Sequence, residues 1–191
     1  MKDALLIIDL QNDYFPGGAM ELSGIIQAAA NADALLKAYR QNHLPVIHIQ
    51  HLSAASGSFF IPKTPGLEIH ESVRPMAGEP LIQKHFPNSF RETGLLDLLT
   101  GSKIQQLTVC GAMSHMCIDA TVRAGFDLGF RCRVVSDACA TRDLVFDNHT
   151  VPAREVHGAF MAALASVYAT PVTTLAVLRF FKPLDRTGKF L

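Results

Sequence analysis

The stretch that decides the fold runs from Leu107 to Gly125 and reads LTVCGAMSHMCIDATVRAG. Its first four residues form an apolar and β-branched run that is too short for a helix and typical of a buried strand. The small residues Gly111 and Ala112 end that run, and from Cys117 onward apolar side chains recur at helical spacing. The stretch therefore predicts a strand, a tight connection and a helix, with Cys117 in the first turn of the helix.

Cys117 is a candidate nucleophile because of this predicted position. Open α/β sheets bind ligands in the crevice beyond the carboxyl ends of their strands, and the unpaired N–H groups of a helix start favour a thiolate. The alternative is a small buried hydrophobic residue, the ordinary state of an intracellular cysteine. Cys110 and Cys132, in predicted strands, and Cys139, in a predicted loop of small residues, fit that structural role better.

Strand and helix patterns alternate along the rest of the chain. The predicted strands cover residues 4–8, 45–51, 81–84, 107–110 and 130–136, and the predicted helices cover 25–41, 93–99, 117–125 and 155–168, followed by a strand or cap over 172–178. Alternation of this kind predicts an α/β fold, in which one parallel sheet has helices on both faces. We expect one three-layer domain spanning residues 1–191.

Composition narrows the class of protein. The chain has 191 residues, a formal net charge of zero and 49% hydrophobic residues, which predicts a globular domain with a full core. It has neither a basic stripe nor an apolar run of roughly 20 residues, so we expect no nucleic-acid partner and no membrane span. Four cysteines without framework spacing and no CxxC predict a reducing cytoplasm rather than a disulfide scaffold or a zinc ribbon. Low charge with high apolar content favours a homo-oligomer, a dimer or tetramer.

Polar residues mark the ends of the predicted strands. Asp9 follows the first strand and Lys84 ends the third, although a turn aspartate and a solvent-exposed lysine are the ordinary alternatives. His48 and His51 in the second strand suggest a metal site. Residues three apart in a strand point to opposite faces, however, and no acidic residue adjoins them in the sequence, so we predict no metal. No glycine-rich phosphate fingerprint is present, and we expect no cofactor.

The sequence around three residues, Asp9, Lys84 and Cys117, resembles the cysteine-hydrolase superfamily named after isochorismatase. That superfamily includes nicotinamidases and N-carbamoylsarcosine amidohydrolases. The matching segments occur in the family's order and span nearly the whole chain. They are LLIIDLQNDYF within residues 4–15, KHFPNSF at 84–90, CGAMSHMCIDATVRAGFDLGF at 110–130, RVVSDACAT at 133–141 and the His157-Gly158 pair.

The resemblance implies a role for each of the three residues. Cys117 would be the nucleophile, Asp9 would take its proton and return it to the leaving group, and Lys84 would keep the aspartate ionised and favour the thiolate. It also implies a cis peptide bond at Ala112-Met113. That bond would aim the N–H groups of Met113 and Cys117 at a developing oxyanion.

Two departures from the family's patterns shape the functional hypothesis. Nicotinamidases bind a metal through an Asp-x-His pair, which the segment His48 to His51 lacks, so a nicotinamidase is disfavoured. Isochorismatases hydrolyse a vinyl ether with the aspartate as acid and need no thiol, so the presence of Cys117 favours attack on a carbonyl carbon. The hypothesis is a metal-independent cysteine hydrolase that cleaves the C–N bond of a small amide or ureido compound through a thioester. Vinyl-ether hydrolysis and a non-catalytic binding or scaffold role remain alternatives.

The substrate pocket is less well defined by the sequence. The Gly-, Pro- and Ser-rich segment from Ser53 to Pro80 is expected to cover the site. Candidate lining residues, each of which equally fits the core or the surface, are Phe15, Phe59, Phe60, Phe86, Phe90, His115 and Met116, with His149 as a further polar contact. A neighbouring subunit could also complete the pocket, and the tail from Phe180 to Leu191 is expected to extend onto a partner.

Overall fold

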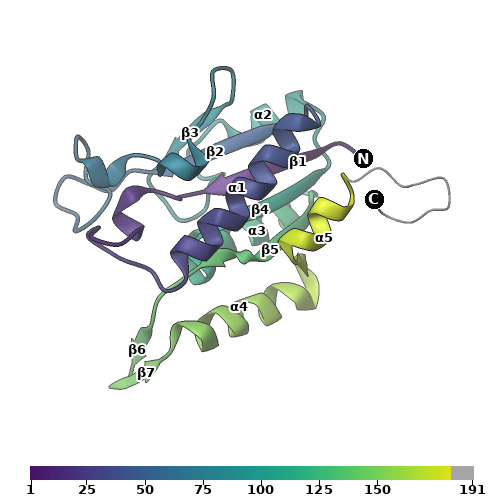
Figure 1. Ribbon diagram of the computed structural model, residues 1–191. Coiled ribbons are helices and arrows are strands. Elements are labelled where there is room, and N and C mark those ends of the chain that lie inside the picture. The colour runs from purple at the N-terminus through teal and green to yellow at the C-terminus, as the bar shows by residue number, and fades with distance from the viewer. Residues whose placement is uncertain (182–191) are drawn as a thin grey trace.

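The computed structural model describes residues 1–181, and it is built on a six-stranded sheet with all strands parallel. The strand order is β3-β2-β1-β4-β5-β8 (Figure 1). The strands are β1 Asp3–Ile8, β2 Val46–His51, β3 Leu81–Lys84, β4 Gln106–Ala112, β5 Arg131–Ala140 and β8 Thr170–Val172, with a separate hairpin of β6 Leu144–Phe146 and β7 His149–Val151. The helices are α1 Ile25–Gln41, α2 Leu95–Gly101, α3 Asp119–Asp127, α4 Ala153–Val167 and α5 Thr174–Arg179. The predicted α/β fold is confirmed.

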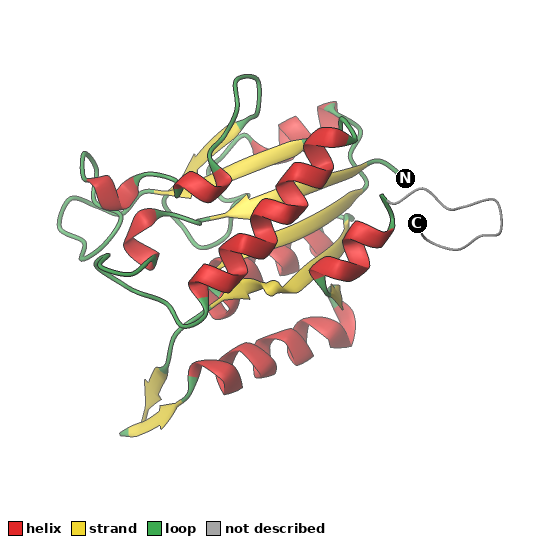
Figure 2. Ribbon diagram, viewed as in Figure 1, coloured by secondary structure: helices red, strands yellow, loops and turns green. Residues whose placement is uncertain are grey.

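Helices cover both faces of the sheet and give the molecule three layers (Figure 2). Successive side chains of β1 point to opposite faces, so Leu5 joins the core beneath α1 and α5 while Leu6 joins the core beneath α2, α3 and α4. Both faces of the strand are therefore buried, as its continuous apolar sequence predicts.

The strand order reverses at β1, and this reversal creates the crevice in which the candidate site lies. From β1 the chain steps outward to β2 and β3, then returns to place β4 on the other side of β1. The connections that leave β1 and β4 consequently diverge at the carboxyl edge of the sheet, where open α/β sheets bind ligands. Asp9 follows β1, and Cys117 lies in the turn Ser114–Ile118 that follows β4.

Several predicted boundaries need correction. Strand β5 continues to Ala140 rather than ending at Ser136, which places Cys139 in the sheet and not in a loop. A register shift between β4 and β5 lets the strand bend there and continue. Cys117 lies in a π-helical turn before α3 rather than in the first turn of that helix. The segment 172–178 divides into the end of β8 and most of α5.

Helix α4 buries less of its apolar surface than its sequence predicts. The apolar spacing of the predicted helix over 155–168 places Ala163 and Val167 on its inward face. Both are exposed, because α4 packs on β8, α3 and the turn Ser114–Ile118 through a narrower stripe. The predicted tail lies largely outside the described residues, which end at 181. Within that described part, no helix combines the length and apolar character needed to cross a membrane.

Gly111 allows β4 to approach β1 closely. Its φ of +125° is in the region that favours glycine, and a Cβ at this position would collide with the carbonyl oxygen of Ile8. A side chain here would push apart the two strands that position Asp9 and Cys117.

We predict that Gly111→Ala lowers the free energy of unfolding by roughly 2–4 kcal/mol, because it adds both backbone strain and a clash with backbone. Urea denaturation monitored by circular dichroism measures the change. The matched control is Gly158→Ala on the exposed side of α4, where nothing lies within 4 Å of the added Cβ. It should stabilise the protein by about 0.5–1 kcal/mol. Equal effects of the two substitutions would contradict the assignment.

Candidate active site

Three side chains from distant parts of the sequence meet at the carboxyl edge of the sheet. The ammonium Nζ of Lys84 lies 2.7 Å from Asp9 Oδ2 and 3.2 Å from Cys117 Sγ. Asp9 is 0%, Lys84 1% and Cys117 5% exposed, so the cluster is almost closed to solvent. The structure thus brings together the three residues that the sequence singles out.

The order of the strands explains why a lysine is needed at this position. Lys84 ends β3, Asp9 follows β1, and β2 lies between them. Two strand spacings separate β3 from β1, about 10 Å in all, so only a long side chain can extend past β2 to the carboxylate. Asp9 itself has a φ of +53°, which turns the chain sharply where β1 ends.

The charges in the cluster are strongly coupled. Burial would lower the pKa of Lys84, but the neighbouring Asp9 carboxylate and Cys117 sulfur outweigh it and raise that pKa, so the amine stays an ammonium. Burial also raises the pKa of the Cys117 thiol, the Asp9 charge raises it further, and Lys84 opposes both. The net direction is upward, so the resting group is a thiol. This corrects the expectation that a helix start would leave Cys117 as a thiolate.

Asp9 retains one free acceptor. Its Oδ2 accepts a hydrogen bond from Lys84, while its Oδ1 is buried and, among the described residues, has no hydrogen-bond partner. A carboxylate oxygen of Asp9 and Cys117 Sγ lie within 4.8 Å of one another. The carboxylate is therefore the candidate acceptor for the proton of the thiol.

His51 is a member of this cluster that the sequence analysis did not assign to it. Its Nδ1 lies 3.0 Å from Lys84 Nζ, and a ring nitrogen lies within 4.8 Å of Asp9 and Cys117 ligand atoms. Asp9, His51 and Cys117 form a set of side chains that could hold a metal ion. However, the Lys84 ammonium already hydrogen-bonds to all three, so a metal would have to displace a buried cation.

His48, the other histidine considered for a metal site, lies elsewhere. Its Nε2 is 2.9 Å from Glu79, whose carboxylate also accepts two hydrogen bonds from the Arg40 guanidinium. Burial lowers the pKa of His48. No acidic residue adjoins this histidine in the sequence, because Glu79 lies 31 positions further along the chain.

The segment from Ser53 to Pro80 is attached to the loop that follows β1. Asp13 Oδ2 accepts a hydrogen bond of 2.6 Å from the Phe60 N–H, and its Oδ1 accepts one of 3.1 Å from Ala19. The ring of Tyr14 packs on Phe60 at 4.5 Å between centroids, and Phe60 lies 6.2 Å from the His51 ring. These contacts place Phe60 beside the cluster, and its role as part of the pocket wall stays a prediction.

Tyr14 is a second residue that the sequence analysis missed. Burial raises the pKa of its hydroxyl, and the nearby Asp9 and Cys117 charges raise it further, while Arg142 opposes them. The Tyr14 hydroxyl is therefore close enough to the cluster to be affected by its charges, although the residue is also part of the core. The run of loop residues after Asp9 was the available signal, since side chains at the carboxyl end of a central strand line the crevice.

The other predicted pocket residues are more scattered. Phe59 packs edge-on against Phe60 at 4.9 Å, and Phe15 stacks on His70 at 3.6 Å. The guanidinium of Arg91 lies 3.6 Å from the centre of the Phe86 ring. Phe15 lies in the loop after β1, Phe59 in the segment from Ser53 to Pro80 and Phe86 in the loop after β3. Their contact with substrate stays a prediction.

Around the Cys117 turn, His115 Nδ1 lies 2.6 Å from Thr141 Oγ1, and Met116 is 41% exposed. Ser114 Oγ lies 2.8 Å from His157 Nδ1, which ties α4 to the turn.

Two of the candidate lining residues, Phe90 and His149, lie in other parts of the structure. Phe90 packs on the Phe130 ring at 6.1 Å and lies against Gly125 of α3, which makes it a core residue and corrects the expectation that it lines the pocket. His149 is exposed on β7 in the separate hairpin, so it is not a contact of the cluster.

The peptide bond between Ala112 and Met113 is cis, as the family resemblance implies. The Met113 carbonyl accepts hydrogen bonds from the N–H groups of Met116 and Ile118, at 3.0 and 3.2 Å. These bonds hold the turn that carries Cys117. The assignment of the Met113 and Cys117 N–H groups to an oxyanion hole stays a prediction.

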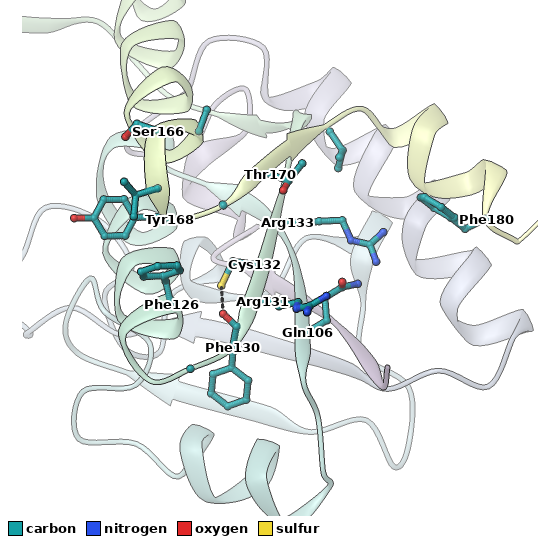
Figure 3. Close-up of a pocket in the computed structure, with 15 residues that line it drawn as sticks. Gln106, Phe126, Phe130, Arg131, Cys132, Arg133, Ser166, Tyr168, Thr170 and Phe180 are labelled. Carbon is teal, nitrogen blue, oxygen red and sulfur yellow. Dashed lines mark hydrogen bonds between the residues drawn. The ribbon is translucent and has the colours of Figure 1, made fainter.

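Two cavities lie away from the cluster formed by Asp9, Lys84 and Cys117. One, of about 810 Å³, is at the opposite edge of the sheet, near the start of β4 and β5, and Figure 3 shows Gln106, Arg131 and Arg133 beside it. The other, of about 550 Å³, lies beside Arg40 and Glu79. Neither is lined by Asp9, Lys84 or Cys117.

Comparison with known proteins agrees with this geometry. The family model described as "Isochorismatase domain" matches residues 3–174. The chain is 53% identical to the isochorismatase family protein YddQ of Bacillus subtilis over 94% of this chain and all of that protein. It is 29% identical to maleamate amidohydrolase of Pseudomonas putida over 90% of this chain and 83% of that one. A putative isochorismatase hydrolase from Oleispira antarctica has a similar crystal structure, with a TM-score of 0.90 and 46% identity over 93% of this chain and 96% of that chain.

We predict that Lys84→Met lowers the free energy of unfolding by about 3–5 kcal/mol at pH 7, because it leaves the Asp9 carboxylate buried without its partner. Urea denaturation measures the loss. The double variant Asp9→Asn with Lys84→Met removes both charges and should recover much of it. As a control, Lys37→Met breaks the exposed pair with Asp33 and should cost less than about 1 kcal/mol. An equal loss in the single and double variants would assign the effect to packing instead.

Proposed function

Because the chain belongs to the isochorismatase family of hydrolases, we propose that it is a metal-independent cysteine hydrolase that cleaves the C–N bond of a small amide or ureido compound. The observation that carries the proposal is the Lys84 ammonium, which lies within hydrogen-bond distance of both the Asp9 carboxylate and the Cys117 sulfur. The cation thereby contacts both the proposed base and the proposed nucleophile, whose ligand atoms lie within 4.8 Å of one another.

In the first half-reaction the Cys117 sulfur attacks the carbonyl carbon of the substrate. The free oxygen of Asp9 accepts the thiol proton as the C–S bond forms, and the adjacent Lys84 ammonium stabilises the negative charge on sulfur. The carbonyl oxygen becomes an oxyanion, for which we propose the Met113 and Cys117 N–H groups as donors. When the oxyanion collapses, the C–N bond breaks and Asp9 returns the proton to the departing nitrogen. A thioester remains on Cys117.

In the second half-reaction water releases the product. Asp9, again a carboxylate, takes a proton from the water as its oxygen attacks the thioester carbon. The C–S bond then breaks, the carboxylic acid leaves, and the proton on Asp9 returns to the Cys117 sulfur. Water and amide are consumed, acid and amine or ammonia are formed, and the enzyme regains its starting protonation.

Carbonyl attack is favoured over the family's vinyl-ether chemistry by two observations. Cys117 is held against Lys84 at 3.2 Å, a contact that an aspartate acting alone would not need. In addition, one relative, similar over most of its length, is named as an amidohydrolase. Vinyl-ether hydrolysis and a scaffold role stay as alternatives that experiment can separate.

We predict that the purified protein releases ammonia from at least one member of a panel of small primary amides and ureido compounds. Cys117→Ala should lower that rate by at least about 10³-fold, because no thioester can form. The control is Cys132→Ala, a buried cysteine outside the cluster, which should retain turnover. Iodoacetamide should label Cys117 in the wild type.

The rival functions have their own signatures in these assays. Full turnover of an enol-ether acid by Cys117→Ala would support vinyl-ether hydrolysis. A Cys117 that no alkylating reagent or substrate modifies would support the scaffold role.

We also propose that the protein is a homo-oligomer whose contact surface includes the β6–β7 hairpin. A two-stranded hairpin outside the main sheet is marginally stable alone, and its Val145 and Phe146 are 72% and 81% exposed. A second copy is the occupant we favour, because a chain of zero net charge meets no electrostatic repulsion from its own copy.

We predict that light scattering after size exclusion gives a mass of at least two chains, and that Phe146→Asp shifts it toward one chain. The control is Met76→Asp, which changes a residue 59% exposed on another part of the surface. A monomeric wild type, or a Phe146→Asp variant of unchanged mass, would contradict the proposal.

A further inference from the structure

The Lys84 ammonium has a hydrogen-bond acceptor for each of its three N–H groups. Asp9 Oδ2 lies at 2.7 Å, His51 Nδ1 at 3.0 Å and Cys117 Sγ at 3.2 Å. An ammonium group has three donors and no acceptor, so these contacts use its full capacity. Two of the acceptors belong to the proposed chemistry, whereas the third, His51, takes no part in the steps described above.

The contact with Lys84 determines which nitrogen of His51 carries a proton. Because the ammonium can only donate, Nδ1 must be the unprotonated acceptor, and the single proton of the neutral ring is on Nε2. Asp9, Cys117 and His85 are the other titratable groups that act on the ring. Burial, together with the charges of Lys84 and His85, lowers the pKa of His51 to about 4. Of these groups, Asp9 alone acts to raise that pKa.

The backbone of His51 is held independently of its ring. The side-chain amide of Gln11 accepts a hydrogen bond of 2.8 Å from the His51 N–H and donates one of 3.0 Å to its carbonyl. Gln11 is itself fully buried and also donates to Leu67 O at 2.8 Å. In the parallel ladder, His51 is the register partner of Lys84. The imidazole is therefore presented to the ammonium from a fixed position.

We propose that His51 is a positioning residue, whose neutral imidazole accepts the third hydrogen bond of Lys84 and so fixes the ammonium between Asp9 and Cys117. Without this acceptor, the lysine could rotate its donors away from the sulfur, or admit water as a replacement. The effect on turnover rests on the proposed function, whereas the protonation state of His51 does not.

Two substitutions separate the acceptor from the bulk of the ring. His51→Asn places an amide oxygen close to the position of Nδ1, while His51→Leu fills similar space with no acceptor. We predict that His51→Leu lowers kcat by about 10- to 100-fold with little change in KM, and that His51→Asn recovers most of the loss. Thermal unfolding of both variants verifies that each is folded.

Two readouts work whether or not an amide substrate is found. Imidazole ¹⁵N NMR of the wild type should show His51 protonated at Nε2 only, at pH 7 and still at pH 5.5. In the unfolded chain His51 takes up a proton near pH 6.5, whereas in the folded protein it does so near pH 4. The wild-type free energy of unfolding should therefore fall more steeply than that of His51→Asn as the pH drops through this window.

Three results would overturn the proposal. One is a His51 ring protonated at Nδ1 at neutral pH, and another is a ring that titrates near its ordinary pKa of about 6.5. The third is equal loss of turnover in His51→Leu and His51→Asn, which would mean that the ring itself matters and not its acceptor. If no amide is turned over but the NMR result holds, the proposed function fails while the assignment of His51 as the acceptor stands.

Discussion

The Lys84 ammonium is buried in a site where an isolated charge would be strongly unfavourable, and the rest of the site is arranged around it. A buried cation is tolerated when an opposite charge is in contact and its remaining donors are satisfied. Asp9 supplies the charge, and Cys117 and His51 supply the other acceptors. Each of these residues comes from the end of a different strand or from the turn that follows one, so the cluster forms only when β1, β2, β3 and β4 are assembled.

The order of the strands determines what this cluster can do. Because β1 lies between β2 and β4, the chain leaves the sheet in opposite directions on either side of Asp9, and a crevice opens at the carboxyl edge. Gly111 lets β4 lie against Ile8 there, and the turn after β4 returns Cys117 toward the aspartate. Asp9, Lys84 and Cys117 are almost closed to solvent, and the exclusion of water strengthens the interactions of their charged groups.

The fold could be predicted from the sequence because its signals are local. The buried run of β1 and the helical spacing of α1 each indicate an element without reference to the rest of the chain. Asp9, Lys84 and Cys117 could be singled out because they follow or end such runs and because their neighbours resemble a family. Boundaries such as the end of β5 depend on pairing with β4, which a local pattern does not record.

The residues that were missed or misplaced depend on packing between distant segments. His51 could be judged only once its register with Lys84 was known, and Glu79 reaches His48 from another loop. Phe90 has an aromatic side chain of the kind that lines pockets, but it lies against Gly125, where the absence of a side chain leaves room for its ring. The protonation of Cys117 depends on the balance of burial, Asp9 and Lys84, which the helix-start argument alone leaves out.

The near-complete burial of the Cys117 thiol has a consequence for oxidative damage. Peroxides attack thiolates that are accessible, and oxidation beyond the sulfenic acid is irreversible for most cysteines. Here Cys117 is 5% exposed, and burial together with the Asp9 charge raises the pKa of its thiol. Enclosure and protonation therefore both slow the attack of oxidants on this sulfur, so the burial that creates the cluster also protects Cys117 from oxidation.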